Sequence, residues 1–205
     1  MQELFEYPED REERNAARAK ALESLLVDKG IIGEDSIDKI LEYFDTKMGP
    51  FNGARIVARA WTDESFKDWL VQDTPSAIAS FDFPTGMAGA EGEHMRAVAN
   101  GPYDHNMIIC TLCSCYPFPV LGLPPYWYKD PAFRARAARE PRAVLREFGL
   151  NLKSDVRVHL WDSSAQIRWF VIPERPDGTD GWSEEELTRL VTPESMMGVA
   201  FADSP

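Results

Sequence analysis

The chain has 205 residues, of which 44% are hydrophobic, and its 34 acidic and 22 basic side chains leave a formal net charge of −12. This length and apolar content are enough to bury one complete core, so we expect a single globular unit with an arm. The acidic balance disfavours nucleic acid, whose phosphates need a basic surface, and no apolar run is long enough to span a membrane.

The first part of the chain is predicted to be helical. Residues 1–10 are polar and have few anchors. Apolar side chains then recur three or four positions apart from Glu12 to Lys29, before Gly30, and from Ser36 to Met48, before Gly49. Shorter helices are expected over Gly53–Trp61, after a cap at Thr62, and from Thr74-Pro75. The apolar stripes of these helices serve either internal packing or docking along a partner subunit.

All three cysteines lie in one segment, Cys110–Cys115, which reads Cys-Thr-Leu-Cys-Ser-Cys. A short apolar strand, Met107–Ile109, leads into it, so the segment starts from a rigid element. Three thiols this close together are poorly placed for disulfides. Thiolates are soft metal ligands, so the pattern favours a metal loop, with buried structural cysteines as the alternative.

The donor set of this loop is incomplete for the commonest cysteine-bound metals. A structural zinc site or an iron–sulfur cluster normally takes four protein ligands. The histidines, at positions 94, 105 and 159, have no zinc-finger spacing. The three sulfurs therefore need other donors, and the nearest are the backbone amides of Ser114 and Cys115.

Beyond the loop, helices alternate with strands. A helix is expected over residues 130–149, with a restart at Pro141. The segments Val156–Trp161 and Gln166–Ile172 alternate as strands do, and residues 162–165 are predicted to join them as a hairpin turn.

The end of the chain completes a mixed architecture. Ser183–Glu186 forms a capping box, and Thr192-Pro193 opens a last short helix. Helices in front and strands behind predict an α+β fold. We expect a helical N-terminal arm over residues 1–82, followed by a layered α/β sandwich domain over residues 83–205 that carries the metal loop.

Several polar residues near the loop are assigned structural parts. Asp162 and Arg168 either form a pair that orients the loop or a salt bridge within the hairpin. His105, just before the strand that enters the loop, is expected to have an ordinary structural role. Five arginines on the helix after the loop form either a solvated face or ion pairs across a subunit interface: Arg134, Arg136, Arg139, Arg142 and Arg146.

The cysteine loop and its surroundings resemble the α subunits of nitrile hydratases. The similarity covers most of residues 20–200 and includes Tyr116-Pro117, Leu121–Pro125, Trp127–Lys129, Arg139–Arg142, Trp161–Ser164, Pro173–Pro176 and Gly178–Gly181. The resemblance implies a non-corrin Co(III) ion in the loop, with low-spin Fe(III) as the alternative. Thr111 is similar to the cobalt type, since the iron type usually carries Ser there.

The same resemblance implies a role for each polar residue of the loop. Cys110, Cys113 and Cys115 would be side-chain metal ligands, and Ser114 and Cys115 would add amide nitrogens. Cys113 would be oxidised to sulfinic acid and Cys115 to sulfenic acid, states that lie on the cysteine oxidation ladder. The Cys115 sulfenate oxygen and a metal-activated water are the two candidate nucleophiles, and the Ser114 hydroxyl would hydrogen-bond close to the ion.

The resemblance also implies partners. In that family two arginines of a β subunit hydrogen-bond the oxidised cysteines, so the site would lie at an interface and this chain would be inactive alone. The β part could be one chain or split in two, and an activator or metallochaperone is a further candidate partner. No cofactor other than the metal is expected. The acidic start of the chain and its clustered thiols indicate the cytoplasm.

Three functions compete at this point. The leading one is a nitrile hydratase, a lyase that adds water to a nitrile to give the amide. The γ subunit of thiocyanate hydrolase shares the same loop, so that activity is the second. A non-catalytic metal-binding or metallochaperone subunit is the third.

Glu91 is the residue that bears most on substrate choice. Many members of the family have Gln-Gly-Glu upstream of the loop, where this chain has Glu91-Gly92-Glu93. A carboxylate at this position could hold water or alter substrate preference, or it could be neutral. Phe118 stands where many members have Trp, which suggests a reshaped pocket wall, and Ala137-Ala138 replaces a bulkier pair in some members.

Overall fold

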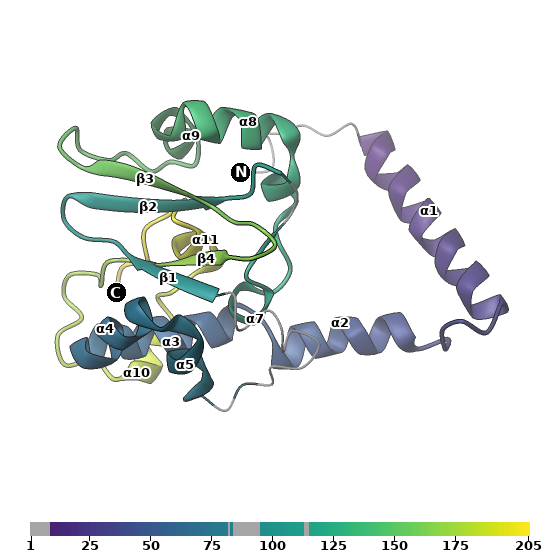
Figure 1. Ribbon diagram of the computed structural model, residues 1–205, viewed down its shortest axis with the longest axis horizontal. Helices are drawn as coiled ribbons and strands as arrows, with labels where there is room; N and C mark the ends of the chain where they lie inside the picture. Colours follow the sequence, from purple (N-terminus) through teal and green to yellow (C-terminus); the bar gives the residue numbers. More distant parts are fainter. Residues whose placement is uncertain (1–8, 82, 84–94, 113–114) are drawn as a thin grey trace. The chain divides into compact units, whose positions relative to one another are not determined.

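The computed structural model describes residues 9–81, 83, 95–112 and 115–205, and it describes the side chains of these residues except 9–12 and 44–47 (Figure 1). The chain divides into two compact units, Met1–Thr46 and Lys47–Pro205. Within the described ranges, no helix combines the length and the apolar character needed to cross a membrane.

The first unit consists of two helices, as expected. Helix α1 spans Glu9–Asp28 and α2 spans Ser36–Lys47. Gly30 ends α1 with a φ of 64°, and the amides of Gly30 and Ile31 donate to Val27 and Leu26, which is the hydrogen-bond pattern of a Schellman cap. The two helices and the turn between them leave large apolar side chains exposed: Leu22, Leu25, Ile31, Ile37, Ile40 and Leu41.

The second unit is built on two pairs of parallel strands. Strand β1, Met95–Ala99, pairs with β4, Arg168–Ile172, and β2, Asp104–Ile109, pairs with β3, Arg157–Asp162. The predicted hairpin over residues 162–165 is therefore wrong, because β3 and β4 each pair with a strand from earlier in the chain. Alternation of polar and apolar side chains indicates that a segment is a strand, but it does not indicate which other strand it pairs with. Strand β1 was not predicted.

The second unit opens with three helices. They are α3, Pro50–Thr62; α4, Glu64–Gln72; and α5, Thr74–Ala79. Helices α4 and α5 pack against β1, and α3 packs against α4. The buried Thr74 hydroxyl donates to the Leu70 carbonyl and accepts from the Ala97 amide, which connects α4 and α5 to β1.

The predicted cap at Thr62 is wrong, because Asp63 caps α4 by accepting from the Phe66 amide. The expected domain boundary between residues 82 and 83 stays a prediction, since residue 82 lies outside the described residues.

Helices lie on both sides of the strands. Helix α8, Pro131–Arg139, and α9, Pro141–Glu147, lie beyond β3 in Figure 1, and α3, α4 and α5 lie beyond β1. The predicted restart at Pro141 is confirmed. Helices α10, Glu184–Thr188, and α11, Pro193–Met197, both begin with capping boxes, one of which was predicted. Two short elements were not predicted: α7, Phe118–Leu121, and η3, Tyr126–Lys129.

Close backbone approaches join these layers. Gly198, at a φ of 76°, follows α11 and passes so near β2 that a Cβ there would lie 1.8 Å from the Asn106 carbonyl oxygen.

Two of the five arginines that were expected to form a solvated or interfacial face make contacts inside the second unit. Arg136 forms a two-pronged ion pair with Glu147 between α8 and α9, and Arg142 donates to the Val156 carbonyl before β3. The mixture of helices and small sheets confirms the predicted α+β class.

Candidate metal centre

The cysteine loop begins where β2 ends. Cys110 directly follows Ile109, the last residue of β2, and it is fully buried. Cys115 is half-buried at the far end of the loop. Cys113, Ser114 and Glu91 lie outside the described residues. The structure thus places two of the four predicted metal ligands, and both of these carry sulfur.

Thr111, at the entry of the loop, is held by the last residue of β3. The Asp162 carboxylate accepts the Thr111 amide over 2.9 Å and the Thr111 hydroxyl over 2.5 Å. Asp162 stands opposite Ile109 in the parallel ladder of β2 and β3, so strand register brings its carboxylate to the loop. Arg168 donates to the Ala165 carbonyl over 3.2 Å. Of the two predicted uses of Asp162, orientation of the loop is the one that these contacts support.

The exit of the loop meets two buried tyrosines. The Tyr128 hydroxyl donates to the Cys115 carbonyl over 3.0 Å. The Tyr116 hydroxyl donates to the Met197 sulfur over 3.4 Å, and the two rings meet edge to face with centroids 5.1 Å apart. Burial raises the pKa of both phenols well above the ordinary value, so both stay protonated and act as donors at neutral pH.

His105 is the second residue of β2, the strand that leads into the loop, and its contacts are structural, as expected. Its Nε2 is 2.8 Å from the Gly198 carbonyl oxygen, and its Nδ1 is 3.3 Å from the Asn100 amide nitrogen. Burial lowers the pKa of His105, which favours the neutral ring. A neutral ring can donate at Nε2 and accept at Nδ1, so one tautomer satisfies both contacts.

The donor chemistry of the described residues fits a soft or borderline transition metal. Cys110 offers a water-excluded thiol at the end of a rigid strand, and Cys115 offers both a thiol and a backbone nitrogen. Across the described ranges, which omit residue 113, no group of three or more His, Cys, Asp or Glu side chains is placed to hold a metal ion. A complete sulfur set therefore needs Cys113.

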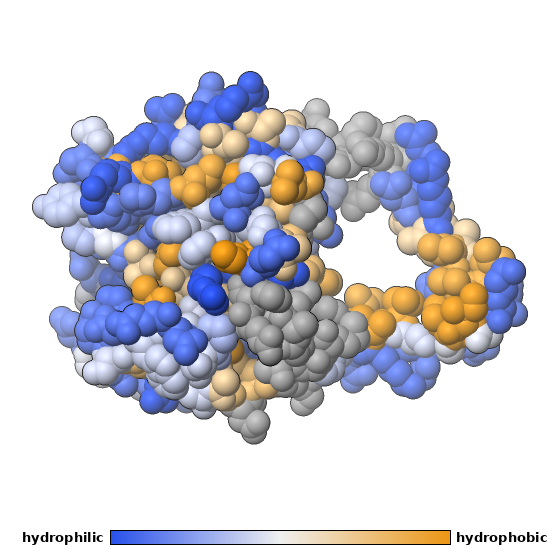
Figure 2. Space-filling view, in the orientation of Figure 1, coloured by the Kyte–Doolittle hydropathy of each residue, from blue (hydrophilic) through white to orange (hydrophobic). Residues whose placement is uncertain are grey.

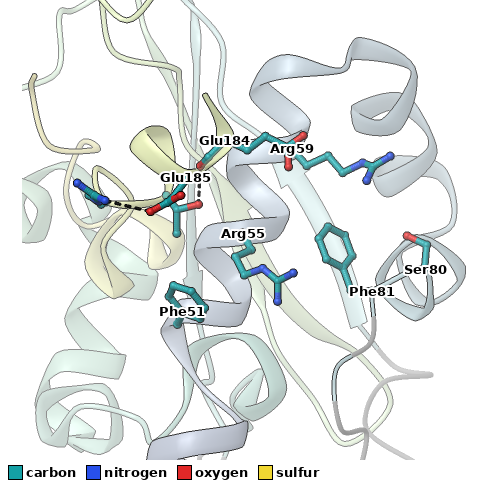
Figure 3. A pocket seen from close by; sticks show the side chains of 9 residues that line it. Phe51, Arg55, Arg59, Ser80, Phe81, Glu184 and Glu185 are labelled. Atoms are coloured by element: carbon teal, nitrogen blue, oxygen red, sulfur yellow. Dashed lines mark hydrogen bonds and ion pairs between the residues drawn. The ribbon is translucent and has the colours of Figure 1, made fainter. Parts of the chain in front are cut away.

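A pocket with a volume of about 580 Å³ lies elsewhere in the second unit, between α3, α5 and α10 (Figure 3). It is lined by Phe51, Arg55, Arg59, Ser80, Phe81, Glu184, Glu185, Thr188 and Arg189. The Arg55 guanidinium lies over the Phe81 and Phe83 rings, and Arg189 pairs with Glu185. None of its lining residues belongs to the cysteine loop, so it does not extend the metal centre.

Two residues at the loop were missed by the sequence analysis. Tyr128 and Ser163 lie in stretches that resemble the α subunits, but neither had an assigned role. Their side chains carry hydroxyls and are almost fully buried. A buried hydroxyl needs a hydrogen-bond partner, but the sequence does not identify a partner thirteen residues away.

Comparison with known proteins identifies the same stretch of chain. The family model described as "Nitrile hydratase, alpha chain" matches residues 13–200. The low-molecular-weight cobalt-containing nitrile hydratase subunit alpha of Rhodococcus rhodochrous is 51% identical over 193 residues, which cover 94% of this chain and 91% of that protein.

Two further similarities widen the range of metals and activities among the relatives. The thiocyanate hydrolase subunit gamma of Thiobacillus thioparus is 38% identical over 187 residues, covering 88% of this chain and 76% of that protein. A solved double mutant of the Fe-type nitrile hydratase of Comamonas testosteroni Ni1 superposes with a TM-score of 0.82 at 36% identity, covering 93% of this chain and 91% of that one.

Proposed function

Because this chain belongs to the nitrile hydratase alpha family, we propose that it is the metal-binding catalytic subunit of an enzyme that hydrates a nitrile to the corresponding amide. The observation that carries the proposal is the anchored cysteine loop. Cys110 is buried at the end of β2, and the next residue, Thr111, is clamped by Asp162. A metal site built on a rigid strand end holds its donors in place without a large loss of entropy on binding.

The proposed metal is Co(III), held by the sulfurs of Cys110, Cys113 and Cys115 and the amide nitrogens of Ser114 and Cys115. Cobalt is supported by Thr111 and by the cobalt-containing relative, and low-spin Fe(III) is the alternative because the solved neighbour is Fe-type. When bound, the ion supplies Lewis acidity that makes the nitrile carbon more electrophilic.

The remaining chemistry belongs to the chain. Cys113 carries a sulfinic acid and Cys115 a sulfenic acid in this proposal, which the family resemblance and the oxidation ladder support. The Cys115 sulfenate oxygen or a water molecule attacks the nitrile carbon. The net reaction adds one water across the C≡N bond and involves no oxidation or reduction of the substrate. Ser114 hydrogen-bonds at the site, and Glu91 holds water or selects the substrate.

A β subunit, present as one chain or as two, is the proposed partner. The first unit leaves an apolar surface over the C-terminal end of α1 and the turn after it (Figure 2), where Leu22 is 57% exposed and Ile31 is 64% exposed. Exposed apolar surface of this kind is typical of a protein interface. Sulfur oxyanions also need charged donors, which arginines of a β subunit would supply. This chain is then inactive alone, and an activator or metallochaperone loads it in the cytoplasm.

Two other functions have support of their own. A thiocyanate-hydrolysing subunit is favoured by the similarity to the gamma subunit of that enzyme. A non-catalytic metal-binding subunit would use the same loop without turnover.

The three functions separate in one experiment. The chain is produced with its β partner in medium that contains cobalt, and the complex is assayed with nitriles and with thiocyanate. We expect about one cobalt per chain and turnover of nitriles. Turnover of thiocyanate alone supports the second function, and bound metal with no turnover of either supports the third. Stoichiometric iron or zinc in active enzyme would contradict the assignment of cobalt.

Loss of single ligands provides the matching test on the chain. Cys113→Ala and Cys115→Ala each remove one donor from a small set, so each should abolish cobalt binding and turnover together. Elemental analysis and a nitrile assay of the same sample measure both. Full turnover without either sulfur would exclude the proposed mechanism.

A further inference from the structure

A buried tyrosine holds the exit of the cysteine loop. The Tyr128 hydroxyl donates to the Cys115 carbonyl over 3.0 Å. Because a neutral phenol has one proton to give, this contact commits the Tyr128 hydroxyl to the backbone of the loop.

The Tyr128 side chain is buried and firmly packed. It is 0% exposed, and its ring meets the Tyr116 ring edge to face with centroids 5.1 Å apart. Away from water a hydrogen bond is stronger than at the surface, so the contact with Cys115 restrains the loop effectively.

Side chains from two other elements therefore hold the two ends of the loop. Asp162, at the end of β3, binds the amide and hydroxyl of Thr111, one residue after Cys110. Tyr128, in η3, binds the carbonyl of Cys115. The entry and the exit of the loop are thus each fixed by one side chain.

We propose that Tyr128 is a positioning residue that holds the Cys115 backbone and so preorganises the cysteine loop for its metal. The inference rests on the proposed function, in which Cys115 donates both a sulfur and an amide nitrogen. Fixing its carbonyl restricts rotation of the peptide on either side of the residue. The donors then need less rearrangement when a metal enters, and the loop opens less readily to release it.

Tyr116 provides a matched control for this role. It is a fully buried tyrosine beside the same loop, and its ring contacts that of Tyr128. Its hydroxyl, however, donates to the Met197 sulfur rather than to the loop backbone. Replacing either tyrosine by Phe removes one buried hydroxyl and keeps the ring, so a general loss of packing or stability should be similar in both variants.

The experiment compares Tyr128→Phe with Tyr116→Phe in the cobalt-loaded complex with the β partner. The readouts are release of cobalt to a chelator on heating and the visible circular dichroism of the sulfur-to-cobalt bands. We expect roughly 2- to 10-fold faster release in Tyr128→Phe, as for one lost hydrogen bond, together with altered bands. Tyr116→Phe should keep the parental bands and release rate.

Hydrogen exchange of the loop amides in the metal-free complex gives a readout that does not depend on the metal. Exchange should be faster in Tyr128→Phe than in Tyr116→Phe. Equal exchange and equal release in the two tyrosine variants would overturn the inference. A parental complex that binds no cobalt and hydrates no nitrile would instead overturn the proposed function, and the exchange comparison would still decide the role of Tyr128.

Discussion

At the scale of single residues, Asp162 shows how a carboxylate can organise a loop without being a ligand. Both of its oxygens are used by one residue, Thr111, and the two contacts fix the backbone and the side chain at once. The contact also gives Thr111 a structural part beyond its resemblance to the cobalt type.

Removal of the Asp162 carboxylate should loosen the entry of the loop. Asp162→Ala leaves the Thr111 amide and hydroxyl without their acceptor, and we expect kcat/KM for a nitrile to fall roughly 10- to 100-fold, with less cobalt retained. Asp162→Asn keeps one acceptor and should lie between this variant and the parent. Asp155→Ala, in the exposed segment before β3, is the control and should behave as the parent. Parental kinetics and cobalt content in Asp162→Ala would refute this role.

Glu91 is the residue whose charge bears most directly on substrate choice. A carboxylate in place of an amide keeps the shape but adds charge and removes two N–H donors. If Glu91 lines the site, Glu91→Gln should change kcat/KM differently for small aliphatic and for polar or larger nitriles, by about 1–3 kcal/mol of transition-state free energy. Steady-state kinetics of the complex on such a panel measures this. Equal kcat/KM for parent and variant on every nitrile would show that Glu91 has no part in selection.

At the scale of elements, the second unit depends on close contacts between helices and loops. Helix α3 packs against α7 at Gly53, where a Cβ would lie 2.3 Å from the Val120 carbonyl oxygen and 2.6 Å from the Met196 sulfur. The first of these atoms is backbone and cannot move independently. Gly53 is therefore required by packing, although glycine lowers the helix propensity of α3.

The sign of the Gly53→Ala effect distinguishes packing from propensity. Helix propensity alone predicts stabilisation by about 1 kcal/mol, whereas overpacking predicts destabilisation by about 1–3 kcal/mol. We expect destabilisation, measured as a lower midpoint in urea unfolding. Gly101→Ala is the control, because a Cβ there meets nothing within 4 Å. A midpoint at or above that of the parent in Gly53→Ala would show that α3 and α7 separate without cost.

At the scale of the whole molecule, the first unit has more large apolar residues than it buries. Its large apolar residues are mostly exposed among the described side chains, whereas the second unit buries more than twenty large or medium apolar side chains. Leucine and isoleucine at helical spacing on a solvent-facing surface indicate an interface. We therefore expect the first unit to serve assembly with a partner.

Substitution on the arm should separate assembly from folding. Leu22→Ser/Leu25→Ser removes two exposed apolar side chains from α1, and we expect affinity for the β subunit to fall at least about tenfold, since each buried leucine contributes about 1.5–3 kcal/mol. Circular dichroism of the chain should be unchanged. Val71→Ser, on an exposed position of α4, is the control. Affinity is measured by titration or by co-elution. An unchanged affinity in the double variant would show that these residues of the first unit are not part of the interface.

The sequence alone was sufficient wherever the signal is local. Apolar spacing, capping residues and proline predicted most helices to within a few residues, because these features act within one or two turns. The Cys110–Cys115 motif predicted the family and the kind of metal for the same reason, since the donors are neighbours in the chain. The comparisons confirm the family.

Only the tertiary structure decided which distant segments meet. Strands β3 and β4 have the alternation expected of a hairpin, yet each pairs in parallel with a strand more than fifty residues earlier, because pairing depends on which edges the rest of the fold leaves open. The support from Asp162 to Thr111 follows from the pairing of β2 with β3, and the support from Tyr128 to Cys115 depends on where the fold places η3. The whole fold decides whether two residues that are far apart in the sequence come close enough for a hydrogen bond. Neither residue by itself predicts such a bond from the sequence.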